Sequence, residues 1–183
     1  KAVEPPYVPA VPQEHLDKLL NTPGQLGPDA ASYLTKLLFG ARLAHPILSV
    51  AIQRLARHVT KWTAECDRRL HRVYCYIDSH LDPMLTAEVM ECVDIHDLTT
   101  DLWPDAGLCG DIMNTKSTSG FFLEICTRGK DNDESPRGMP ISWGCKKQAS
   151  TSTHTAEAET VSFCHALLHE ALPVQALLCR GLE

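Results

Sequence analysis

Trp103-Pro-Asp-Ala-Gly-Leu-Cys-Gly-Asp111 lies near the start of the stretch that decides the fold, which spans residues 99 to 163. Along this stretch an acid ends one apolar segment, two strand-like segments follow, and a second acid opens a helix. Such an order gathers carboxylates from distant parts of the chain at one edge of a sheet, where they could hold divalent metal ions. The later blocks of the stretch are Thr115-Lys-Ser-Thr-Ser-Gly120, Pro140-Ile-Ser-Trp-Gly-Cys-Lys-Lys-Gln148 and Ala156-Glu-Ala-Glu159.

The pattern from Leu98 onward is sheet-like and then helical. It predicts three neighbouring antiparallel strands followed by a helix that packs on them. We expect Pro173 to break this helix before a last helical turn or two ending at Glu183. The expected elements are a strand from Leu98 toward Asp105, a strand from Gly120 to Cys126, a polar loop from Thr127 to Gly138, a strand from Met139 to Lys147 and a helix from Glu157 to Leu168.

The first half of the chain is predicted to be helical after a proline-rich arm. Four prolines within residues 1 to 12 favour an extended arm, because proline fixes the backbone and removes an amide donor. Apolar residues at spacings of three and four predict helices over 13–21, after Asp29, over 47–59 and over 62–77, with Asp29 as a cap and Pro46 as an end. The expected core positions are Tyr33, Leu34, Leu37, Leu38, Leu43, Ile47, Val50, Ala51, Leu55, Val59, Trp62, Cys66, Leu70, Val73 and Ile77.

The composition is that of an ordinary folded protein, with 44% hydrophobic and 22% charged residues among 183. A change of character near residue 85 favours two subregions. No run of about 18 uncharged apolar residues occurs, so we expect no transmembrane helix. The eight cysteines include no Cys-x-x-Cys pair, which favours reduced thiols in an intracellular compartment over zinc-ribbon or thioredoxin-type sites.

Charge is unevenly distributed along the chain, whose net charge is −6. Residues 41–80 hold seven Lys or Arg against three acids, a balance of +4, whereas residues 81–183 hold seven against sixteen, a balance of −9. The basic helices could grip nucleic-acid phosphates, present a plain solvated face, or dock against the acidic half. The candidate nucleic-acid-binding residues are Arg54, Arg57, Arg68, Arg69 and Arg72.

Four blocks in one order carry a resemblance to a known family. Asp-Ala-x-x-x-Gly-Asp from Asp105, Lys-Ser-Thr-Ser-Gly-Phe from Lys116, Ile-Ser-Trp-x-x-Lys-Lys-Gln from Ile141 and Glu-Ala-Glu from Glu157 together resemble the ribonuclease H domain of copia-type retrotransposon polyproteins. The preceding helical segment resembles the end of the reverse transcriptase of those polyproteins, more loosely. The resemblance implies an α+β fold, in which a helical N-terminal half precedes a partial ribonuclease H-like α/β unit of three antiparallel strands and a helix.

The same resemblance implies a division of the chain into four regions. They are a Pro-rich arm with a short helix (1–28), a helical end of a reverse transcriptase-like region (29–82), a linker (83–97) and a truncated ribonuclease H-like domain (98–183).

The resemblance also assigns the candidate site. In ribonucleases of this family, carboxylates hold two Mg²⁺ ions that activate water and stabilise the leaving oxygen of the RNA phosphodiester. By motif, Asp105 matches the acid of the first strand and Glu159 the acid of the first helix, as catalytic residues and metal ligands. Asp111 is a further candidate metal ligand, although a solvent-facing loop residue is the commoner role of such an Asp. Three departures argue against activity: Gly107 stands where the family has a second Asp, and the chain ends before the strands that would carry a third and a fourth acid.

Two other patterns have less support. Tyr76-Ile-Asp-Ser79 has one Asp where the polymerase motif Tyr-x-Asp-Asp has two, and it lies at a helix end. His165 and His169 lie one helical turn apart beside Glu170, a spacing compatible with two zinc ligands. No third ligand is apparent, which favours surface or capping roles.

Two functions therefore follow from the sequence. The first is a retrotransposon-derived fragment whose ancestral activity is cleavage of RNA in RNA/DNA hybrids and which is inactive as an isolated chain. The second is a non-catalytic structural or interaction subunit that binds protein subunits of a larger assembly, an organellar one being an option. The missing carboxylates and the Pro-rich arm favour an inactive chain.

Overall fold

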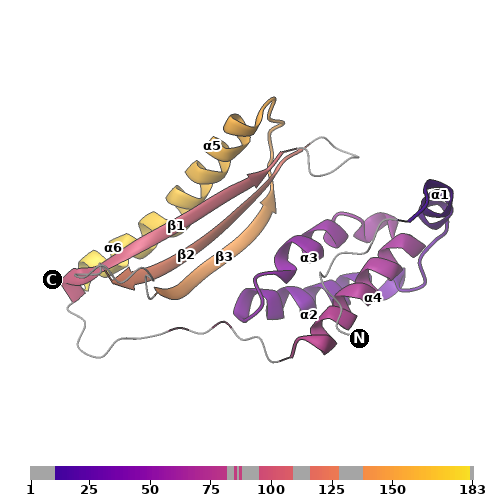
Figure 1. Cartoon of the computed structure of the whole chain (residues 1–183), viewed down its shortest axis with the longest axis horizontal. Coiled ribbons are helices and arrows are strands. Elements are labelled where there is room, and N and C mark those ends of the chain that lie inside the picture. Colours follow the sequence, from indigo (N-terminus) through magenta and orange to yellow (C-terminus); the bar gives the residue numbers. More distant parts are fainter. Residues whose placement is uncertain are drawn as a thin grey trace. The chain divides into compact units, whose positions relative to one another are not determined.

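The computed structural model describes residues 11–81, 85, 87, 95–108, 116–127 and 138–181. The chain forms two compact units, Lys1–Met84 and Leu85–Glu183. The first unit is helical and the second combines a three-stranded antiparallel sheet with a long helix (Figure 1). The predicted α+β class with a helical N-terminal half is thus confirmed.

The first unit has a core built by three helices. Leu70 and Val73 of α4 are almost completely buried with Leu48, Ile52 and Leu55 of α3. Their burial stabilises the unit because each large aliphatic side chain removed from water contributes about 1.5–3 kcal/mol. The helical elements are α1 (Gln13–Asn21), a 3-10 turn (Gly27–Asp29), α2 (Ala30–Leu43), α3 (Leu48–Ala56), a second 3-10 turn (Val59–Lys61) and α4 (Ala64–Ser79).

Most of the expected core positions of these helices are confirmed, and three are wrong. Leu38, Leu43 and Ile47 are 38%, 62% and 52% exposed. The buried face of α2 includes Ala30 and Ala41 near the two ends of the helix, and Leu38 and Leu43 lie outside this face. The helix after Pro46 begins at Leu48, so Leu48 takes the core position expected for Ile47. The confirmed buried positions are Leu34, Leu37, Ala51, Leu55, Trp62, Cys66, Leu70 and Val73.

Asp29 does not cap α2, contrary to the prediction. It precedes the helix with φ −105° and ψ 2°, and its side chain makes no capping hydrogen bond. A capping side chain needs a more extended backbone at that position, whereas Asp29 already belongs to a 3-10 turn.

Asp67 fastens the start of α4 to the loop that precedes α2. Its carboxylate accepts hydrogen bonds from the backbone N–H groups of Gln25 (2.6 Å) and Leu26 (3.2 Å) and from the indole N–H of Trp62 (2.6 Å). Gly24 lies so close to the backbone of Thr63 that a Cβ would collide with its carbonyl oxygen. This acid of the basic segment is therefore structural.

The second unit is organised around its sheet, in which β2 is central and β1 and β3 are the edges. Both pairs of strands are antiparallel, and Trp103, Phe122 and Trp143 are neighbours in register across all three. A bulge at Leu123/Glu124 shifts the pairing of β2 with β3. The strands are β1 (Leu98–Gly107), β2 (Thr118–Thr127) and β3 (Gly138–Lys147), so the three predicted strands are confirmed within a few residues.

Helix α5 (Thr155–Ala166) packs on β1 and β2, as predicted (Figure 1). Ala158, Ser162 and Ala166 recur every four residues and are 0–1% exposed. Residues four apart lie on one face of a helix, and small side chains let that face approach the sheet closely. Because of this close approach, α5 lies directly beside β1 and β2.

Pro173 does not break the helix, contrary to the prediction. A π-helical turn, Leu167–Ala171, follows α5, and α6 (Leu172–Arg180) continues directly with Pro173 in its first turn. Proline lacks an amide donor, so a continuous helix tolerates it best where the backbone hydrogen-bonding pattern already changes. The wider π turn supplies the change of hydrogen-bonding pattern.

The continuous helix Thr155–Arg180 is the one described helix whose length and apolar character would allow it to cross a membrane, on those two criteria alone. Its first half packs on the sheet. A weakly apolar helix with this packing is consistent with the expectation of no transmembrane helix.

Candidate functional site

Asp105 and Glu159 line one shallow depression at the edge of the sheet. Asp105 lies near the end of β1 and Glu159 on the second turn of α5, and both side chains are exposed. The depression has a volume of about 420 Å³, and both acids are among the residues that line it. Two acids far apart in the sequence are thus gathered at one edge. The other lining residues are Pro104, Ala156, Thr160 and Phe163.

Ser162 holds α5 against the two strands at this place. Its hydroxyl, 1% exposed, lies 2.7 Å from the carbonyl oxygen of Asp105 and 3.2 Å from that of Gly120, and it donates to these two oxygens. Ser162 lies one helical turn after Glu159. The same contact therefore positions the backbone of Asp105 and the helix that carries Glu159.

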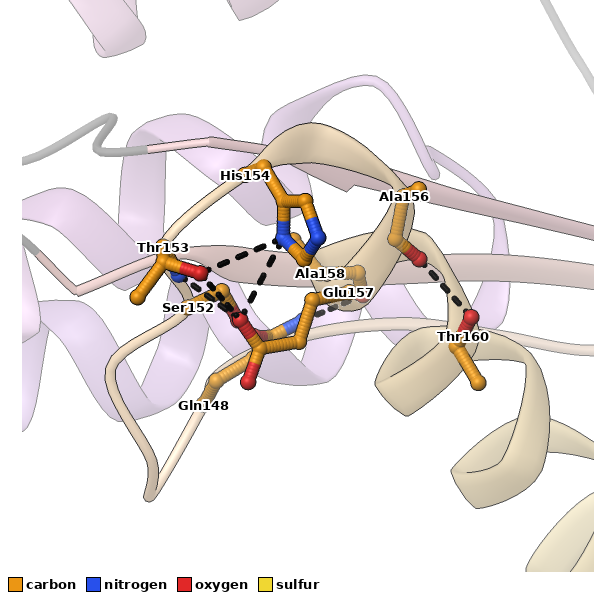
Figure 2. A network of polar contacts seen from close by, with 8 residues as sticks. All are labelled: Gln148, Ser152, Thr153, His154, Ala156, Glu157, Ala158 and Thr160. Atoms are coloured by element: carbon orange, nitrogen blue, oxygen red, sulfur yellow. Dashed lines mark hydrogen bonds and ion pairs between the residues drawn. The ribbon is translucent and has the colours of Figure 1, made fainter.

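Gln148 fixes the start of α5 to the sheet, and Figure 2 shows its contacts with Ser152 and Ala158. Its side-chain amide donates to the hydroxyl of Ser119 on β2 (2.9 Å) and to the carbonyl of Ala158 (2.8 Å), and its oxygen accepts from Ser152 (3.1 Å). Gln148 is 5% exposed. A buried amide with its donors and acceptor satisfied gives a defined geometry, because any displacement would leave a polar group without a partner.

Glu157 closes the first turn of α5. Its carboxylate accepts hydrogen bonds from the backbone N–H of Thr153 (2.8 Å) and from the Thr153 hydroxyl (3.0 Å), as Figure 2 shows. Both hydrogen bonds lower the pKa of the Glu157 carboxyl group, and the bond from the backbone N–H has the larger effect. Glu157 is therefore bonded to the segment just before α5, whereas Glu159 lines the depression.

The two acids at the depression could serve as ligands of one Mg²⁺ ion more readily than of two. Mg²⁺ is often held by one or two carboxylates together with waters and substrate phosphates. Asp105 and Glu159 would supply such ligands, and a bound ion would supply positive charge next to a phosphate. Among the described residues no group of three or more His, Cys, Asp or Glu could hold a metal ion. Asp111 lies outside the described residues.

Two of the five candidate phosphate-binding arginines are joined to a buried acid. Glu65 is 2% exposed and accepts hydrogen bonds from Arg68 (2.8 and 3.0 Å) and Arg69 (2.8 Å). Arg54, on α3, is exposed, whereas Arg57 and Arg72 are half-buried. Arg54, Arg57 and Arg72 also have interactions of their own, so a phosphate would share these side chains with contacts inside the protein.

The two histidines of the last helix lie side by side. The ring centroids of His165 and His169 are 4.7 Å apart. Burial lowers the pKa of His165 first, and the nearby His169 and Lys146 lower it further against the opposite effect of Glu170. Glu170 accepts a hydrogen bond from Ser142 of β3 (3.0 Å). The described residues provide no third ligand for a zinc site.

Ser162 and Gln148 were not predicted from the sequence to have a role at this site. The spacing of Ala158, Ser162 and Ala166 was a usable signal, because small residues every four positions indicate close packing of a helix. A serine within such a row must find an acceptor when it is buried. Gln148 follows a strand directly, and nothing in its local sequence indicates contacts with three other segments.

No family model, no curated protein and no solved structure matches this chain.

Proposed function

We propose that this chain derives from the ribonuclease H region of a copia-type retrotransposon polyprotein and that it no longer cleaves RNA on its own. The observation that carries the proposal is the depression shared by Asp105 and Glu159. These are the two acids that the resemblance assigns, and three antiparallel strands followed by a helix surround them, as expected of the first part of such a domain.

The number of acids argues against catalysis by the isolated chain. In-line displacement at a phosphodiester requires ions that stabilise both the attacking and the leaving oxygen. Two carboxylates can hold one ion weakly, and a poorly fixed ion gives little stabilisation of the charge that develops in the transition state. We therefore infer a residual binding site for a divalent cation, with Asp105 and Glu159 as its ligands and Asp111 as a further candidate.

Two measurements test this proposal. Mn²⁺ should broaden amide NMR signals near Asp105 and Glu159 in the intact chain, and Asp105→Asn or Glu159→Gln should weaken this binding about tenfold or more. Asp17→Asn, which changes an exposed acid of α1, is the matched control. The chain with millimolar Mg²⁺ or Mn²⁺ should leave a labelled RNA/DNA hybrid intact. Metal-dependent cleavage that either variant abolishes would contradict the inactive assignment, whereas Mn²⁺ binding unaffected by both would contradict the site.

A second candidate function, a non-catalytic interaction subunit, is favoured by exposed apolar side chains. Phe39, Leu43 and Ile47 of the first unit and Trp103, Leu168 and Leu177 of the second are more than half exposed. Large exposed apolar side chains that gather in one place are typical of surfaces that bind other proteins. Tandem-affinity purification of the intact chain from its own cells tests this candidate, which predicts stoichiometric partner subunits.

A further inference from the structure

The sheet of the second unit has one face that α5 does not cover. Ser142, whose hydroxyl contacts Glu170 after α5, belongs to the helix-covered face. Residues adjacent in a strand point to opposite faces, so Trp143 and its register partners belong to the other face. Trp103 of β1, Phe122 of β2 and Trp143 of β3 thus form one row across the sheet, which we call the aromatic row.

The aromatic row is accessible to a partner. Trp103 is 58% exposed, and Phe122 and Trp143 are half-buried. The rings of Phe122 and Trp143 stack with centroids 6.2 Å apart and planes 24° from parallel. The indole N–H of Trp103 donates to the Glu124 carboxylate at 3.1 Å, which restrains the orientation of the ring.

Two carboxylates face each other beside this row. Asp101 and Glu124 are directly paired across β1 and β2, and like charges in such a pair destabilise a sheet. Among the described residues no ion pair joins either one to a basic side chain. Lys147 is the one basic residue on this face in the described strands, and it is paired with Thr118 at the far end of β3. In the described part of this face, acids therefore outnumber basic residues.

These charges decide which kind of partner fits the aromatic row. Nucleic acid, which also stacks on exposed aromatic rings, would bring phosphates next to Asp101 and Glu124. A second copy of the same face would bring two further carboxylates into contact with them. A guanidinium group would be attracted to the face of an indole ring and would pair with a carboxylate through two hydrogen bonds.

We propose that Trp103, Phe122 and Trp143, together with Asp101 and Glu124, form a docking surface for an arginine-bearing segment of a partner protein. One arginine lies over the Trp103 indole and relieves the repulsion between the two carboxylates, while apolar groups of the segment cover Phe122 and Trp143. Asp105 lies two residues after Trp103 on the same face of β1, but this docking requires neither Asp105 nor Glu159, and it does not depend on descent from a nuclease.

The test uses the intact ¹⁵N-labelled chain and an acetylated, amidated nona-arginine peptide as the probe. The three tryptophans give three indole N–H signals in NMR spectra. The signals of Trp103 and Trp143 should shift on titration, whereas that of Trp62, which is buried and bonded to Asp67, should not. An uncharged Gly-Ser peptide should leave all three unchanged.

Variants separate this surface from general attraction between a basic peptide and an acidic protein. The pair Asp101→Asn with Glu124→Gln and the single change Trp103→Ala should each weaken binding about tenfold. Glu14→Gln with Asp29→Asn removes the same charge from exposed sites in the first unit and should change affinity less than about twofold. Far-ultraviolet circular dichroism checks that each variant is folded.

Four outcomes would overturn the proposal. They are an equal loss of affinity in the control pair, a shift of the Trp62 signal in place of the other two, a shift of the Trp103 signal with oligo-dT but not with the peptide, and a concentration-dependent shift of that signal in the chain alone. The last two would assign the face to single-stranded nucleic acid or to a second copy.

Discussion

Glu65 is an acid that the basic helix α4 holds almost out of contact with water. Burial alone would raise the pKa of its carboxyl group, but the hydrogen bonds and charges of Arg68 and Arg69 outweigh burial and lower it below the ordinary 4.5. The guanidinium groups, on side chains 28% and 39% exposed, keep contact with solvent. This arrangement ties two residues of the basic face to the core of the first unit.

At this residue we predict a loss of stability on Glu65→Gln. Glutamine is neutral and cannot accept from both arginines through two charged oxygens, so the free energy of unfolding of the helical unit should fall by about 1–3 kcal/mol at pH 7. Urea unfolding followed by the Trp62 indole N–H signal in NMR spectra measures the change. Glu14→Gln, at an exposed position of α1, should change stability by less than about 0.5 kcal/mol.

The same variant gives a pH dependence of known sign. A carboxyl group whose pKa is lower in the folded state adds stability that is complete above its unfolded pKa. That stability is lost as the pH falls below 4.5 and through the lower folded pKa. The difference between the parent chain and Glu65→Gln should therefore be constant near neutral pH and shrink in acid. A difference that grows in acid would contradict the assignment.

At the scale of elements, the sequence predicted which segments form helices and strands better than how they are joined. Sheet-like segments and apolar residues at spacings of three and four are local signals, and they located all three strands and α4. The replacement of Ile47 by Leu48 as the core residue of α3, like the π turn before Pro173, depends on packing against other segments. Local sequence patterns do not contain this information. The meeting of Asp105 and Glu159 was expected from a family resemblance, whereas the contacts of Ser162 that join their elements were not.

The attachment of α5 to the sheet leads to a prediction at Gln148. Gln148→Glu preserves shape but removes the donors to Ser119 and Ala158 and places a carboxylate beside a carbonyl oxygen. The hydroxyls of Ser152 and Ser119 can donate to this buried carboxylate but replace its hydration only in part, so the sheet unit should lose about 2 kcal/mol or more of stability at pH 7. Protonation of the new carboxyl group restores one donor, so part of the loss should be recovered in acid.

Hydrogen exchange of α5 amides measures the effect of Gln148→Glu in the intact chain. Gln175→Glu, an exposed position of α6, makes the same chemical change in the same unit and should leave protection of α5 nearly unchanged. Equal exchange in the two variants would mean that Gln148 does not anchor the helix.

At the scale of the whole molecule, charge separates the two ends of the chain. The segment 41–80 carries a balance of +4 and the segment 81–183 a balance of −9. Attraction of nucleic acid to the basic segment would rely on Arg54, Arg57 and Arg72 beside the pair already bound to Glu65. Phosphate contacts release counterions, so their number is measured by the salt dependence of binding.

If the basic helices bind an RNA/DNA hybrid, the logarithm of the association constant should fall linearly with the logarithm of the salt concentration. Arg54→Ala and Arg72→Ala should each reduce the slope by about one, because each removes one phosphate contact and leaves the Glu65 pair intact. Fluorescence anisotropy with a labelled hybrid between 50 and 200 mM salt measures the slope, and Lys18→Ala on α1 is the control of equal charge. Binding that is absent, independent of salt, or reduced equally by the control would contradict nucleic-acid binding by the basic face and would favour the interaction subunit.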